Sequence, residues 1–175
     1  MRTAADCRSR NRVCKGTAMK VNIGLKDAAR TSVVKILNTL LADEFVLYAK
    51  TRRFHWNVVG PHFGELHRFF ESQYEAIDEH IDEIAERARA LGGVATGSLK
   101  EFLAASRIEE QAGRNPDARG MIEALLADHE AIIRALREDI EVVDGKFGDA
   151  GTGDFLTGLL EQHEKMAWML RANLG

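Results

Sequence analysis

Residues 66–91, LHRFFESQYEAIDEHIDEIAERARAL, are the stretch that decides the fold. Their apolar members recur at steps of three and four, which places them along one face of an α-helix. Pro61 precedes the stretch, where proline suits a first helical turn, and Gly92-Gly93 follows it as a stop signal. We therefore expect a long amphipathic helix beginning just after Pro61. Its apolar stripe is Leu66, Phe70, Tyr74, Ile77, Ile81, Ile84, Ala88 and Leu91.

Three more stretches show the same periodicity. The first covers about residues 27–53, the second is capped by Asn115-Pro116, and the third follows a glycine-rich turn at residues 145–153. A short helix is expected over residues 98–105, because Ser98 and Glu101 have the spacing of a capping box.

Length and composition favour one all-α domain. The chain has 175 residues, 45% hydrophobic and 29% charged, and only two prolines. Four amphipathic helices cannot bury their stripes alone, so a four-helix bundle is the simplest arrangement. The link of roughly 20 residues after the helix of residues 66–91 is a long crossover that holds the short helix, as in ferritin-like bundles. No apolar run approaches the roughly 18 residues of a membrane span.

The N-terminus differs from the rest of the chain in charge. Residues 1–18 carry a net charge of +4, which leaves −7 for the remainder of a chain whose total is −3. We predict two parts, a basic arm over residues 1–20 and the bundle over residues 21–175. Both cysteines, Cys7 and Cys14, lie in the arm and are interpreted as free thiols of a cytoplasmic protein, because no other metal-ligating spacing accompanies them. Met19 offers a second translation start.

Polar side chains follow one flank of the 66–91 helix. At 100° per residue, His67, Glu71, Asp82 and Glu86 share a face that is displaced from the apolar stripe by roughly a right angle. They form two i,i+4 pairs, and each pair can reach a common point. The pairs lie 11 to 15 residues apart, which is about 16–22 Å along the helix axis, so one metal ion cannot touch both.

Two copies of this helix, packed antiparallel about a two-fold axis, solve that problem. His67 and Glu71 of one chain then face Asp82 and Glu86 of the other, which gives two equivalent sites per dimer. His55 would join one of these groups across the tight turn before Pro61. Mixed imidazole and carboxylate ligands suit iron or manganese. The alternative is an acidic flank that is merely solvated.

A second metal hypothesis concerns the core stripes. Glu44, His129 and His163 each face inward and might meet inside the bundle. Carboxylate-bridged di-iron bundles typically use Glu-x-x-His pairs, and none of the six histidines has glutamate three residues earlier. We therefore interpret His129 and His163 as buried, hydrogen-bonded core residues.

Three motifs together resemble one family. They are His55-Trp56-Asn57, then Leu66 to Glu71, then Asp78-Glu79-His80-Ile81-Asp82-Glu83-Ile84-Ala85-Glu86-Arg87 before Leu91-Gly92-Gly93. This pattern is similar to that of the Dps mini-ferritins, DNA-binding proteins from starved cells, and the likeness covers roughly residues 22–174.

The resemblance implies a hollow dodecamer that oxidises ferrous iron with hydrogen peroxide or dioxygen and stores the ferric product. It implies that His55, His67, Asp82 and Glu86 bind iron at dimer interfaces, with up to two ions per site. Glu71 stands where the family commonly has aspartate, and we keep it as a ligand. Trp56 matches a tryptophan beside the site that can intercept oxidising equivalents.

Two further roles follow from the resemblance. Asp149 and Asp154 match acidic residues that line three-fold pores, where rings of carboxylates concentrate cations. The alternative is that both are ordinary turn and cap residues.

The competing function is DNA binding by the basic arm, which would place the protein at the nucleoid. Nearly all of the positive charge of the arm disappears if translation starts at Met19. The candidate DNA contacts are Arg2, Arg8, Arg10, Arg12, Lys15 and Lys20.

Overall fold

The computed structural model describes residues 21–175, so the arm of residues 1–20 and its candidate DNA contacts lie outside the described part. The described residues form helices and connecting turns, with no β-strand among them. The helices are α1 (Asp27–Asn57), α2 (Phe63–Ala90), α3 (Leu99–Ala105), α4 (Ala118–Ile140), a π-helical turn η1 (Glu141–Lys146) and α5 (Ala150–Ala172).

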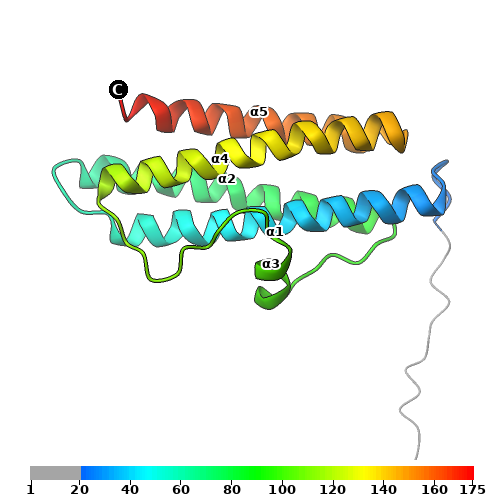
Figure 1. Ribbon diagram of the computed structural model, residues 1–175, viewed down its shortest axis with the longest axis horizontal. Coiled ribbons are helices and arrows are strands. Elements are labelled where there is room, and N and C mark those ends of the chain that lie inside the picture. Colours follow the sequence, from blue (N-terminus) through cyan, green and yellow to red (C-terminus); the bar gives the residue numbers. More distant parts are fainter. Residues whose placement is uncertain (1–20) are drawn as a thin grey trace, which may run out of the picture.

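Four of these helices make the predicted bundle. α1 packs against α2 and α4 packs against α5, and each pair runs antiparallel (Figure 1). α2 and α4 run in the same direction, because the crossover between them returns along the length of the bundle (Figure 1). Within residues 21–175, no helix is both long and apolar enough to cross a bilayer.

The predicted core is largely confirmed. Phe70, Ile77, Ile84 and Leu91 of the stripe on α2 are almost fully buried, while Tyr74 and Ile81 are only partly so. The partly buried members lie toward the edge of the stripe, where the helix face turns from the core to solvent.

The crossover carries α3, which lies outside the bundle beside α1 (Figure 1). The predicted capping box is present, with Ser98 and Glu101 bonding each other's backbone N–H groups. Phe102 is buried and stacks on Phe45 of α1 at 4.4 Å between ring centroids. This short helix therefore covers a partly apolar strip of α1.

Three boundaries differ from the sequence prediction. α1 continues to Asn57, so His55 belongs to the helix rather than to the turn after it. α4 is capped by the carboxylate of Asp117, which accepts from the N–H of Gly120, and not by Asn115-Pro116. The glycine-rich turn is shorter than expected, because Asp149 caps α5 through the N–H of Thr152 and so starts that helix at Ala150.

Candidate metal sites

His55 and His67 lie together although twelve residues separate them in the chain. Their rings stack with centroids 3.7 Å apart and planes inclined by 22°. The close packing of α1 against the start of α2 brings them together, across the turn at Pro61. The sequence left open which of the two groups His55 joins, and the structure places it beside His67 within one chain.

Backbone hydrogen bonds fix both imidazoles. Nδ1 of His55 lies 2.7 Å from the carbonyl oxygen of His67, and Nδ1 of His67 lies 2.9 Å from that of His55. A carbonyl oxygen can only accept, so Nδ1 must carry the proton in both rings. In the neutral ring each Nε2 then has a lone pair, and no residue of the described chain bonds to it. This is the arrangement found around metal-binding histidines.

Glu71 lies one helical turn beyond His67, half-buried, and Tyr74 donates its hydroxyl to Glu71 at 3.3 Å. Partial desolvation and the Glu71 carboxylate raise the pKa of Tyr74, which keeps the phenol protonated as a donor. Trp56, next to His55, exposes 65% of its surface. Glu71 and Trp56 therefore flank the two histidines on an accessible end of the α1–α2 hairpin.

Asp82 and Glu86 lie elsewhere on the same helix. Both are exposed, and Asp82 lines an open acidic depression with Asp78, Glu79 and Glu83. Because α2 is continuous, the 15 residues from His67 to Asp82 span about 22 Å. A single chain therefore holds two separate halves of the predicted site.

The two predicted pore residues have different surroundings. Asp149 is buried, and its carboxylate accepts from the N–H and hydroxyl of Thr152 and pairs with Arg87 at 3.2 Å. Asp154 is exposed in the first turn of α5. Only Asp154 is therefore free within the chain to face an opening.

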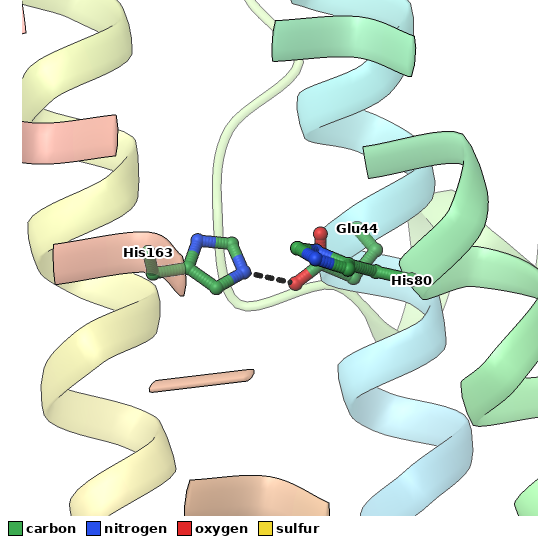
Figure 2. Close-up of side chains that lie close together, drawn as sticks. All are labelled: Glu44, His80 and His163. Carbon is green, nitrogen blue, oxygen red and sulfur yellow. Dashed lines mark hydrogen bonds and ion pairs between the residues drawn. The ribbon is translucent and has the colours of Figure 1, made fainter. Parts of the chain in front are cut away.

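A second cluster lies in the bundle core. Among residues 21–175, the one group of three metal-ligating side chains close enough to share an ion is Glu44, His80 and His163, with their ligand atoms within 4.8 Å of one another. Figure 2 shows His163 reaching from α5 toward Glu44 of α1, with His80 of α2 beside it. His163 Nε2 lies 2.7 Å from Glu44 Oε1.

His129 of α4 completes this cluster by placing its Nδ1 2.9 Å from Nδ1 of His163. His129 and His163 are fully buried and hydrogen-bonded, as expected. Burial lowers the pKa of His80, and it lowers the pKa of His129 well below 6.5. Both rings are therefore neutral near pH 7, which is the form that binds metals.

Sequence reasoning missed His80 as a member of this group. The signal was its spacing, three residues after Ile77 and four before Ile84, which puts it at the edge of the apolar stripe. His80 stands beside the charged residues Asp78 and Glu79, and the predicted core stripe does not include it.

The fold and these histidine and carboxylate sets define a ferritin-like protein. The family model of the ferritin-like domain matches residues 34–175. The chain is 49% identical over 153 residues to an uncharacterized low temperature-induced protein of Nostoc, covering 87% of this chain and 86% of that one. It is 43% identical over 142 residues to DNA protection during starvation protein 2 of Bacillus anthracis, covering 81% of this chain and 96% of that one.

A solved structure gives the same result. The Dps protein of Vibrio cholerae, a member of a broad superfamily of ferritin-like diiron-carboxylate proteins, superposes with a TM-score of 0.83 at 34% identity. The match covers 90% of this chain and 99% of that one. The chain belongs to the Dps family of mini-ferritins. Membership supports iron storage and protection in general as its role.

Proposed function

We propose that this protein oxidises ferrous iron at sites formed between two chains and stores the ferric product inside a hollow homododecamer. The observation that carries the proposal is the separation of the predicted ligands along α2. His55, His67 and Glu71 form one half, and the exposed Asp82 and Glu86 form the other. A two-fold partner with an antiparallel α2 would unite them.

Each half would contribute different chemistry. The Nε2 lone pairs of His55 and His67 are held in fixed directions by the Nδ1 hydrogen bonds. Because a neutral imidazole adds no negative charge, these two ligands suit the ferrous ion. Asp82 and Glu86 are hard anionic donors that favour the ferric product. Glu71 would hold a second ion at the same site.

The redox balance is a two-electron step. Two ferrous ions each release one electron, and hydrogen peroxide accepts both as its O–O bond breaks, so that two protons yield two water molecules. No hydroxyl radical is released when both electrons are delivered together. Dioxygen is the alternative oxidant. Trp56, exposed beside His55, would intercept oxidising equivalents that escape the site.

Entry of iron is assigned to acidic openings at the three-fold axes. Asp154 is the stronger candidate, because its carboxylate is exposed whereas that of Asp149 already caps α5 and pairs with Arg87. A ring of such carboxylates would raise the local concentration of ferrous ions.

The test is ferrous iron oxidation by the assembled protein, followed by ferric absorbance with peroxide and separately with air. Asp82→Ala/Glu86→Ala is expected to abolish rapid oxidation while size-exclusion chromatography shows an unchanged shell. The matched control is Glu138→Ala/Glu161→Ala, which removes two exposed carboxylates from other helices. Fast oxidation by peroxide in Asp82→Ala/Glu86→Ala would show that the site assignment is wrong.

DNA binding is a second candidate function, favoured by the net charge of +4 in residues 1–18 and by the DNA-protection name of the Bacillus anthracis relative. Binding would depend on the arm, multiplied over the subunits of a shell, because the rest of the chain is acidic. A gel-shift assay at low and moderate salt would compare the full chain with one beginning at Met19. A shift only with the full chain supports the arm, and no shift with either removes this function.

A further inference from the structure

We infer that the bundle core contains a second metal site, separate from the inter-chain site, in which Glu44, His80 and His163 bind one first-row divalent cation within a single chain. The inference concerns ligands that the proposed iron oxidation does not use. It rests on ligand spacing, on unpartnered buried atoms and on a route from the surface.

The ligand spacing is already close to that of a bound ion. Bonds of about 2.0–2.1 Å in tetrahedral geometry place neighbouring ligand atoms roughly 3.3–3.4 Å apart. The three ligand atoms lie within 4.8 Å of one another, and the closest pair, His163 Nε2 and Glu44 Oε1, is 2.7 Å apart. Side-chain adjustments on the order of 1 Å therefore suffice. Two imidazoles with one carboxylate form a set that suits ferrous iron and zinc.

Unpartnered polar atoms in the core favour the binding of a cation there. Glu44 Oε2, His80 Nδ1 and His129 Nε2 are all buried and have no hydrogen-bond partner within the described chain. Leaving such atoms unsatisfied is unfavourable, and native proteins rarely do so without a reason. Two of them belong to the proposed ligands Glu44 and His80, and a cation between the side chains, with a water on its open position, would give them a partner.

His129 acts as a positioning residue for His163. When Glu44 is ionised and His163 is neutral, His163 Nε2–H donates to Glu44, and His163 Nδ1 accepts from His129 Nδ1–H. A cation on His163 Nε2 takes the place of that proton and reverses the order: His163 Nδ1–H then donates to His129 Nδ1, and neutral His129 carries its own proton on Nε2. The pair thus keeps its hydrogen bond in both states and holds the ring toward the ion.

A route to the site begins at the surface between α2 and α5. These helices contact each other only sparsely, and a hollow of about 350 Å³ between them is lined by His80 together with Glu83, Asp154 and Gly158. Two exposed carboxylates at the hollow attract cations, and His80 belongs to both the hollow and the cluster.

A cation here would fasten the two hairpins together. Its ligands come from α1 and α2 on one side and from α5 on the other, with His129 of α4 behind His163. Because only the folded chain assembles these ligands, binding should stabilise it. At a free cation concentration a hundred times Kd, the thermal midpoint is expected to rise by about 5–10 °C.

The test uses the full-length assembled protein, stripped of metal and titrated anaerobically with Co²⁺, whose visible absorbance reports coordination, and with redox-inert Zn²⁺. The background is Asp82→Ala/Glu86→Ala, which removes the proposed inter-chain site. One ion per chain is expected to remain. Adding Glu44→Gln, which keeps the size and the hydrogen-bonding capacity of the side chain, should weaken that binding by at least about a hundredfold, and His80→Gln should do the same.

Two substitutions of His129 test its role in positioning His163 through their effect on Co²⁺ affinity. His129→Leu should weaken Co²⁺ binding by about 10–100-fold and alter its spectrum, whereas His129→Asn, which keeps a polar group near Nδ1, should restore most of the affinity. No ion bound in the background variant, or binding that Glu44→Gln and His80→Gln leave unchanged, overturns the inference. Either result is separate from the oxidation test, in which Asp82 and Glu86 are judged by iron turnover.

Discussion

His55 and His67 each place Nδ1 against the backbone carbonyl oxygen of the other, at 2.7 and 2.9 Å. This reciprocal pair joins the end of α1 to the first turns of α2, and it sets the tautomer of both rings. The same contacts that hold the hairpin closed therefore leave both Nε2 atoms available for a metal. A structural and a ligating role are combined in one pair of side chains.

His67→Asn separates these two roles. The Asn side-chain nitrogen lies near the position of Nδ1 and can still donate to the carbonyl of His55, but the variant has no atom equivalent to Nε2. We expect an intact shell and iron oxidation slowed by at least about tenfold, measured by stopped-flow absorbance with peroxide. His62→Asn, at an exposed histidine, is the control. Unchanged rates in His67→Asn would remove His67 from the ligand set.

Much of the fold could be predicted from the helix periodicity, because an apolar stripe shows which face of each helix is buried. The same periodicity also predicted that Asp82 lies far from His67, since residue spacing along one helix converts directly to distance. It could not show how helices are rotated against one another, which is why Glu44 and His163 were expected to meet inside the bundle but His80 was not recognised as a member of their group. It also missed the end of α1 at Asn57, because the helix continues past Arg53 where the His55 side chain contacts the backbone carbonyl of His67.

Glu71 is expected to hold the second ion of each inter-chain site. Glu71→Ala should therefore lower ferrous binding from two ions to one per site, as measured by anaerobic titration. The other ion, which His67 of one chain and Asp82 and Glu86 of the partner subunit would bind, should remain. Glu138→Ala, at an exposed carboxylate on α4, should bind iron like the unmodified protein. A stoichiometry unaffected by Glu71→Ala would exclude Glu71 as a ligand.

Lys50 and Asp128 form a buried ion pair between α1 and α4, at 2.5 Å, with the Lys50 side chain fully buried. Asp128→Ala leaves that ammonium group without its partner, and we expect a loss of about 3–5 kcal/mol in the free energy of unfolding. Lys50→Met/Asp128→Leu should recover most of the loss, because both charges are then removed. Denaturant unfolding at matched subunit concentration measures both variants.

The comparison for that pair is Glu123→Ala, which breaks an exposed ion pair with Arg119 and should cost no more than about 1 kcal/mol. Equal effects of Asp128→Ala and Glu123→Ala would show that the buried pair has no special importance for stability.

His129 should make the metal-free protein less stable in mild acid. Burial lowers its pKa well below 6.5 in the folded chain, so below pH 6.5 the unfolded chain binds a proton that the folded chain does not. Its contribution to stability is fully present above pH 6.5 and is lost as the pH falls toward the folded pKa, at up to about 1.4 kcal/mol per pH unit. His129→Asn should remove this part of the pH dependence of the unfolding free energy between about pH 7 and pH 5.

His62→Asn is the control, and its unfolding free energy should change with pH in the same way as that of the unmodified protein, since His62 is exposed. If the unfolding free energy of His129→Asn has the same pH dependence as that of the unmodified protein, His129 does not remain neutral in the folded core. The donor and acceptor roles inferred for His129 and His163 must then be revised.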